Sequence, residues 1–327
     1  MSYAQFLKTI CCGGELESDL AERDAALLFG AMLDGGVPEL ELGALLVALQ
    51  MKPTALTELA GYANAVNERM FRLVPPPAKA QPVVLASYGG VRDQPNLLPL
   101  LALLLQRFGV PVLVHGMLNG EGGIASAYVF RELGVMPCAT LTQAGEVLRK
   151  TGVAFVPTAV LAPGLAELIA LRGRLGVRSV AHAVARLLDP FDGDSLRVVA
   201  VAQESALALN RDYLLATGAH AMLLQGAAGE PYADPLHRPR IEYLYEGGVE
   251  TLFGAEVPAM KKITTLPEGM NAAASAAWIR RALAGETPVP LPIVNQLAAC
   301  LFAAGYTTDM NQAKAIVAVE TGSLAAA

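Results

Sequence analysis

Residues 82–134 contain two short apolar runs, and each run leads into a turn that contains glycine. The first run covers residues 83–87 and precedes Gly89 and Gly90, and the second covers residues 110–114. A helix-like apolar pattern lies between the two runs. Strands that alternate with helices are typical of a parallel sheet, and glycines after a strand let backbone N–H groups approach an anion. The segment therefore predicts a phosphate-binding βαβ unit.

The chain before this segment has only helical character. Apolar residues recur at helical spacing through residues 1–72. Three prolines at 75–77 then end the helical region, because proline lacks an amide hydrogen and restrains the residue before it. A helical pattern returns over residues 167–188, and strand-like runs at 196–202 and 221–225 resume the alternation. The sequence thus predicts a helical unit and an α/β unit that a second helical stretch interrupts.

Four segments resemble, in the same order, parts of anthranilate phosphoribosyltransferases and their class II nucleoside phosphorylase relatives. They are residues 45–66, the Arg-Gly-Arg-Leu-Gly-Val-Arg-Ser run at 172–179, the strand end at 221–226 and the stretch 295–306. Because the segments are spread along the sequence, the resemblance covers nearly the whole chain.

This resemblance implies an α/β fold with a small all-helical N-terminal domain and a larger α/β domain. The larger domain would contain a mostly parallel central sheet, and a cleft would lie between the two domains. The small domain would comprise residues 1–72 with inserted helices at about 160–188, and the larger one residues 75–159 and 189–327. The resemblance also implies a homodimer.

The motifs that carry the family's chemistry are degraded in this chain. The family's pyrophosphate loop reads Gly-Thr-Gly-Gly-Asp, whereas residues 87–91 read Ser-Tyr-Gly-Gly-Val. Of the family's Lys-His-Gly-Asn-Arg motif, only His115 and Gly116 match. We therefore predict a vestigial phosphate loop that comprises Ser87, Gly89, Gly90, Arg92, His115 and Gly116.

The family's magnesium ligands are also missing. An adjacent Asp-Glu pair holds the metal in the family, and the equivalent stretch, residues 226–234, has no such pair. Magnesium and the loop donors neutralise phosphoribosyl diphosphate and stabilise the departing pyrophosphate. We therefore expect no catalytic residue, no metal site, no cofactor and no anthranilate phosphoribosyltransferase activity.

Two alternatives to this loss of activity stay open. One is a divergent phosphoribosyltransferase, or other glycosyltransferase, with rebuilt ligands: Arg92 on the phosphates and Glu230 or Asp234 on a metal. The other is a scaffold that senses a small anion or metabolite through Gly89, Gly90 and Arg92 without chemistry.

Residues 229–240 resemble the equivalent stretch of the YbiB-type branch of the family. They read Gly-Glu-Pro-Tyr-Ala-Asp-Pro-Leu-His-Arg-Pro-Arg. Proteins of this branch keep the transferase fold and dimer and bind nucleic acid. Together with the missing motifs, the resemblance implies a homodimer whose partner is DNA or RNA, bound without sequence preference.

Basic residues gather in one short stretch. Residues 172–186 contain four arginines, one histidine and no acidic residue. A helix that began at residue 177 would place Arg178, His182 and Arg186 on one face. A second basic group lies within residues 237–240. The predicted nucleic-acid contacts are Arg172, Arg174, Arg178, His182, Arg186, Arg238 and Arg240.

The charge of the whole chain limits such a surface. Acidic residues outnumber lysine and arginine by 30 to 24, which gives a formal net charge of −6 at pH 7. Polyanions normally bind where lysine and arginine are in excess, so any footprint must be local. The alternative for the same arginines is ion pairing with neighbouring helices or simple solvation. Apolar runs stay below the roughly 18 residues of a membrane span, so we expect a cytoplasmic protein without membrane contact.

Overall fold

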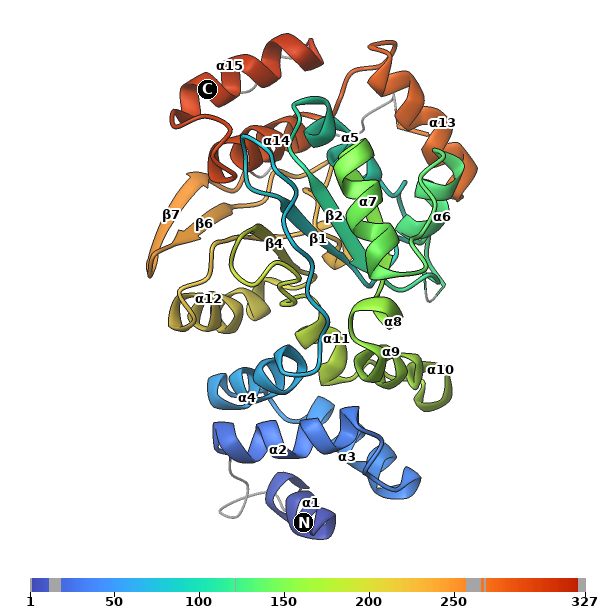
Figure 1. The fold of residues 1–327 in the computed structure, drawn as a ribbon, viewed down its shortest axis with the longest axis vertical. Coiled ribbons are helices and arrows are strands. Elements are labelled where there is room, and N and C mark those ends of the chain that lie inside the picture. The colour runs from blue at the N-terminus through green and yellow to red at the C-terminus, as the bar shows by residue number, and fades with distance from the viewer. Residues whose placement is uncertain (1, 12–18, 121, 257–265, 268, 323–327) are drawn as a thin grey trace. The chain divides into compact units, whose positions relative to one another are not determined.

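The computed structural model describes residues 2–11, 19–120, 122–256, 266–267 and 269–322. Two compact units make up the chain (Figure 1). The helical unit consists of residues 1–71 and 158–188, and the sheet unit of residues 72–157 and 189–327. Among the described residues, no helix has both the length and the apolar character needed to cross a lipid bilayer.

The helical unit is built from two separate parts of the sequence. The N-terminal part supplies α1 (Tyr3–Cys11), α2 (Glu22–Leu33), α3 (Glu39–Met51) and α4 (Leu56–Asn67). The inserted part supplies α8 (Thr158–Leu161), α9 (Pro163–Ala170), α10 (Arg172–Leu175) and α11 (Val180–Ala185).

Close packing of α2 against α4 organises the N-terminal part. A Cβ atom at Gly61 of α4 would lie 2.4 Å from the Glu22 carbonyl oxygen of α2, so only glycine allows this approach. The rings of Phe29 and Tyr62 then lie 5.0 Å apart between the two helices. The first turn of α4 is fixed by Glu58, whose Oε1 accepts a hydrogen bond from the Leu20 backbone N–H at 2.9 Å.

The sheet unit is built around a seven-stranded sheet with the strand order β3-β2-β1-β4-β5-β6-β7. The strands are β1 (Val83–Ser87), β2 (Val112–Gly116), β3 (Val153–Pro157), β4 (Leu196–Val201), β5 (Ala221–Gln225), β6 (Ile241–Tyr245) and β7 (Gly248–Phe253). Strands β1 to β5 pair in parallel, and the β6-β7 hairpin adds an antiparallel edge. The expected mostly parallel sheet is thus confirmed.

Helices and short 3₁₀ turns connect these strands or follow the last of them. They are α5 (Leu98–Arg107), α6 (Ser126–Glu132), α7 (Leu141–Thr151), η2 (Glu204–Ala206), α12 (Leu207–Ala216), η3 (Ala227–Gly229), α13 (Ala272–Leu283), α14 (Leu291–Ala303) and α15 (Met310–Thr321).

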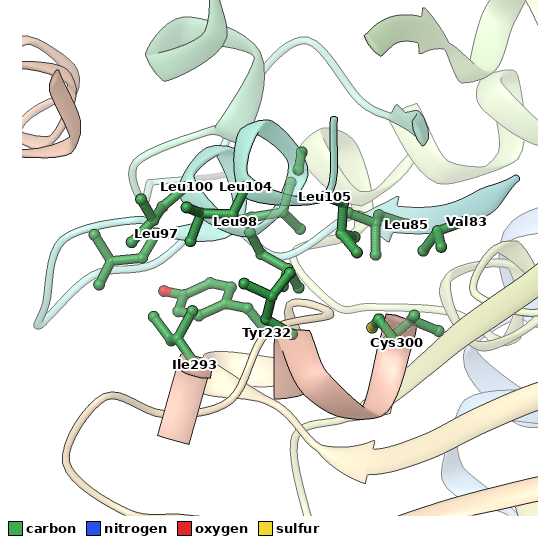
Figure 2. Close-up of a cluster of buried hydrophobic side chains, with 14 of the residues drawn as sticks. Val83, Leu85, Leu97, Leu98, Leu100, Leu104, Leu105, Tyr232, Ile293 and Cys300 are labelled. Atoms are coloured by element: carbon green, nitrogen blue, oxygen red, sulfur yellow. The ribbon is translucent and has the colours of Figure 1, made fainter. Parts of the chain in front are cut away.

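The main core of the sheet unit lies between β1, α5 and α14. Side chains alternate between the faces of a strand, and Val83 and Leu85 both join this core. Figure 2 shows the Tyr232 ring between leucines of α5 and Ile293 of α14. Each large apolar side chain buried here contributes about 1.5–3 kcal/mol to stability. This core fixes the loop that carries Tyr232.

The topology predicts where a ligand would bind. Strand β1 lies between β2 and β4, so the order of the strands reverses beside it. In open α/β sheets, ligands bind beyond the carboxyl ends of the strands at such a reversal. The turn after β1 lies at this position. Hydrogen bonds to Glu230 join it to the turn after β5.

Candidate functional site

The turn after β1, residues 87–91, is the predicted phosphate loop, and we call it the glycine loop. Its backbone donors point at a side chain of the same protein. The N–H groups of Gly89 and Gly90 both donate to Oε1 of Glu230, at 2.6 and 3.1 Å. The Ser87 hydroxyl donates to Oε2 of the same carboxyl group at 2.6 Å. Glu230 is fully buried, with 0% of its surface exposed. The donors that suit a phosphate are therefore already used.

Two further polar side chains complete the surroundings of Glu230. The Ser126 hydroxyl at the start of α6 lies 2.8 Å from Ser87 Oγ and donates to Glu230 Oε2 at 3.3 Å. Asn96 Nδ2 donates to Ser126 Oγ at 2.9 Å and to the Ile124 carbonyl oxygen at 2.9 Å. Ser87, Asn96 and Ser126 are all buried. Buried polar groups stabilise a fold only when they are hydrogen-bonded, and this network meets that condition.

A tight turn after β5 brings Glu230 to the glycine loop. The 3₁₀ turn η3 contains Ala228 in the left-handed region, at φ 53°. A Cβ atom at Gly226 would lie 1.9 Å from the Glu230 carbonyl oxygen, so the turn requires glycine at its start. The Ala227 N–H donates to the Tyr232 carbonyl oxygen at 2.9 Å and closes the turn.

The residues that follow Glu230 are held by the core. The Tyr232 hydroxyl donates to the Pro95 carbonyl oxygen at 3.2 Å, and its ring is fully buried. Gln296 of α14 accepts a hydrogen bond from the Ala233 N–H at 2.7 Å and donates to the Pro231 carbonyl oxygen at 3.1 Å. The chain directly after Glu230 is therefore fixed.

A second group of glycines packs directly on the glycine loop. A Cβ atom at Gly90 would lie 2.7 Å from the Gly120 carbonyl oxygen, and one at Gly123 would lie 2.9 Å from the Val91 nitrogen. Val91 and Ile124 also form an antiparallel bridge. The described part of this turn leaves little room above Gly90.

His115 does not act as a cation. Strand β2 continues through Gly116, so His115 lies inside the strand rather than after it. Its Nδ1 is hydrogen-bonded to the Tyr88 hydroxyl at 2.8 Å, and its Nε2 is buried without a partner among the described residues. Burial lowers the pKa of His115 to about 3. The imidazole is neutral at pH 7 and supports the glycine loop through Tyr88.

The magnesium and diphosphate of the family do not fit this arrangement. Glu230, which one alternative assigns to a metal, points into the glycine loop instead. Asp234 accepts a hydrogen bond from the Leu236 N–H at 2.8 Å and lies 3.7 Å from His237 Nδ1. Across the described ranges, no three His, Cys, Asp or Glu side chains are grouped as a metal ion requires. The anion-sensing alternative needs the Gly89 and Gly90 N–H groups, and both of them donate to Glu230. Arg92 is exposed beside this loop.

The basic stretch 172–186 differs from the predicted helical stripe. Helix α11 begins at Val180 and ends at Ala185, so Arg178 precedes it and Arg186 follows it. His182 is 3% exposed, and its Nδ1 accepts a hydrogen bond from the Ser179 N–H. Burial, with the positive charges of nearby arginines, lowers its pKa to about 4. The prediction that His182 adds positive charge is wrong, because the side chain is buried and neutral.

Three arginines nevertheless lie close together in this stretch. The positive charges that lower the His182 pKa belong to Arg178, Arg172 and Arg186. Arg174 is not among these three arginines. It forms a surface ion pair with α3, in which its Nη1 lies 3.2 Å from Glu39 Oε1. Surface ion pairs of this kind contribute little to the stability of a protein. We call Arg172, Arg178 and Arg186 the arginine cluster.

The second basic group lies in the sheet unit and is paired with acids. Arg238 lies 3.4 Å from Glu256, and Arg240 lies 2.9 Å from Glu242. Both arginines line a pocket of about 350 Å³ beyond the ends of β4 and β5, which Glu204 and Glu256 also line. Acidic side chains therefore share this pocket with the two arginines.

Motif comparison alone did not identify the residues that occupy the glycine loop. Glu230 stands in a stretch that the motifs assign to metal binding, and Asn96 and Ser126 belong to no quoted motif. These residues come together only because the segments that follow β1, β2 and β5 meet in the folded protein. The one signal in the sequence is a glutamate next to the glycine turn after β5.

Comparison with known proteins agrees with this fold. Residues 5–70 match the family model for the helical bundle domain of a glycosyl transferase family. The chain is 34% identical over 318 residues to "Uncharacterized protein YbiB" of Escherichia coli strain K12, across 97% of this chain and 99% of that protein. It is 27% identical over 316 residues to the anthranilate phosphoribosyltransferase of Leifsonia xyli, across 94% of this chain and 88% of that enzyme.

A solved structure extends the comparison to three dimensions. The anthranilate phosphoribosyltransferase of Thermus thermophilus matches with a TM-score of 0.77 at 27% identity, over 99% of this chain and 95% of that chain. The similarity includes both the helical bundle and the sheet. By sequence and by structure, this chain belongs to the anthranilate phosphoribosyltransferase family.

Proposed function

We propose that this protein binds DNA or RNA without sequence preference, as a homodimer, and that it has no anthranilate phosphoribosyltransferase activity. The arginine cluster supplies the main phosphate contacts. Phosphate contacts position a nucleic acid and provide affinity, but they do not read its sequence. The resemblance of residues 229–240 to the YbiB-type branch supports the same function.

The observation that carries this proposal is the gathering of three guanidinium groups around one buried, neutral histidine. Arg172 begins α10, Arg178 precedes α11 and Arg186 follows it, yet all three lower the pKa of His182. Several arginines near one another raise the local density of positive charge, which favours contact with a polyanion. Arginine also suits phosphate because its planar donors bind two oxygens at once.

The state of the glycine loop supports the loss of the family's reaction. A phosphoribosyl diphosphate needs several donors and a metal to neutralise its charge. In this chain the Gly89 and Gly90 N–H groups and the Ser87 hydroxyl bind Glu230 instead.

Fluorescence anisotropy with labelled single- and double-stranded DNA tests the proposal. We expect Arg178→Ala/Arg186→Ala to weaken binding by about tenfold at about 50 mM salt, because two phosphate contacts are lost. The matched control is Arg280→Ala/Arg281→Ala, which removes the same charge from the exposed end of α13. Equal weakening by both variants would mean that net charge, and not the arginine cluster, governs binding.

A further inference from the structure

The Glu230 carboxyl group lies where the glycine loop would hold an oxyanion. Backbone N–H groups of a glycine turn after a strand are the usual donors for phosphate oxygens. Here one carboxyl oxygen receives the N–H groups of Gly89 and Gly90, and the other receives the hydroxyls of Ser87 and Ser126. We propose that Glu230 is a built-in anion, which occupies the glycine loop and excludes phosphate and diphosphate from it.

The occupant is part of the fold and does not act as a lid. A lid needs a segment with few buried contacts, whereas the segment around Glu230 is anchored by a buried tyrosine and a buried glutamine. The Tyr232 hydroxyl bonds to Pro95, and Gln296 bonds to both Pro231 and Ala233. Withdrawal of the whole segment would require these contacts to break.

While Glu230 occupies the glycine loop, no second anion can bind there. Each backbone N–H carries a single hydrogen, and the hydrogens of Gly89 and Gly90 both point to Glu230 Oε1. The carboxyl group is fully buried, so it cannot turn into solvent to share its site with a second anion. An incoming phosphate would have to leave this acid buried without donors, which is strongly unfavourable.

It follows that the loop remains an anion site whose ligand is attached to the chain. Removal of the side chain should leave four donors around a space the size of a carboxyl group. The ligand class for that space is a small carboxylate, such as formate or acetate. Inorganic phosphate carries the same kind of oxygen but needs more room, which the close approach of Gly90 and Gly120 restricts.

Chemical rescue tests this inference. In Glu230→Ala, we expect the melting temperature of the sheet unit to fall by about 5 °C or more, because buried donors lose their acceptor. Sodium formate should then raise it by about 3 °C or more above sodium chloride at equal ionic strength. Trp278, the single tryptophan of the chain, is buried in α13 and reports on this unit by its fluorescence.

Two control variants make the rescue specific. Leu223→Ala opens a space at a fully buried position of β5, so it should lower the melting temperature without rescue by formate. Glu230→Gln fills the same space as the original side chain, so formate should not raise its melting temperature. Rescue of either control as large as that of Glu230→Ala would overturn the proposal.

The unaltered protein provides an arm that does not depend on any variant folding. Titration with inorganic pyrophosphate to millimolar concentration, in the presence and absence of magnesium, should leave the amide signals of Gly89 and Gly90 unshifted in NMR spectra. Binding that induces amide shifts at Gly89 and Gly90 in NMR spectra would overturn the proposal. Neither arm measures nucleic-acid binding, so failure here is distinguishable from failure of the proposed function.

Discussion

At the scale of single residues, the backbone donors of the glycine loop share one acceptor, the Glu230 carboxyl group. Gly89 and Gly90 follow the predicted strand, and their N–H groups converge on one oxygen as a phosphate loop requires. Glu230 is 140 residues or more away in sequence, and only the pairing of β1, β4 and β5 brings the two turns together. A motif reports which residues are present at one turn; it does not report which distant side chain fills it.

The burial of His115 should make the stability of the protein depend on pH. Its pKa of about 3 in the folded protein lies below the value of about 6.5 expected in an unfolded chain. Between these values the unfolded chain binds a proton that the folded chain does not bind. The free energy of unfolding is therefore not lowered by His115 above about pH 6.5, and it falls as the pH drops through this window.

We therefore expect His115→Gln to flatten the acid dependence of stability. Between pH 7 and pH 5, the free energy of unfolding of the original protein should fall by about 2 kcal/mol more than that of the variant. Urea unfolding followed by Trp278 fluorescence measures the free energy of unfolding of the two proteins at each pH. Parallel pH dependence in the two proteins would show that His115 is not held neutral by burial.

At the scale of elements, the strongly apolar segments were predictable and the context-dependent ones were not. Strand β1 has the predicted bounds, 83–87. The basic stretch was predicted as a helix from residue 177, but α11 begins only at Val180, because Ser179 is its N-cap residue and has an extended backbone. Strand β3 and the β6-β7 hairpin were not predicted. Strand β7 is largely exposed and carries little apolar signal, whereas β3 is as long and as apolar as β1 and could have been predicted.

Two helix glycines in the helical unit give a matched element-scale prediction. In an exposed helix, glycine to alanine stabilises by up to about 1 kcal/mol. Gly43→Ala in α3 should do so, since its nearest new contact is the Leu175 side chain at 3.8 Å. Gly61→Ala in α4 should instead destabilise, because its Cβ would lie 2.4 Å from the Glu22 carbonyl oxygen.

Thermal unfolding followed by circular dichroism compares the two variants. We expect Gly61→Ala to lower the melting temperature by several degrees and Gly43→Ala to leave it equal or higher. A stabilised Gly61→Ala variant would mean that α2 and α4 are not packed as closely as described.

At the scale of the whole molecule, the family and the fold class were predictable because the matching segments run along the entire chain. The family match and the mostly parallel sheet are both confirmed. Nucleic-acid binding and the homodimer remain proposals. Both follow from the resemblance of residues 229–240 to the YbiB-type branch and from the missing motifs.

An exposed apolar face supports the proposed homodimer. Helix α3 leaves Leu40 83% exposed and Met51 80% exposed, with Val47 between them in sequence. Exposed apolar patches of this kind mark interaction surfaces. We expect light scattering to give twice the 34.2 kDa of one chain, and Leu40→Glu/Met51→Glu to give a monomer. Val319→Glu, at an equally exposed position of α15, should leave the dimer intact.

The salt dependence of DNA binding tests the central claim most directly. For duplex DNA, log affinity falls with log salt concentration by about 0.9 per phosphate contact. Between about 50 and 200 mM salt, we expect the original protein to bind with a steep slope, and Arg178→Ala/Arg186→Ala to be shallower by about 1.8. Equal slopes for the two proteins, or no binding at the lower salt concentration, would contradict the account.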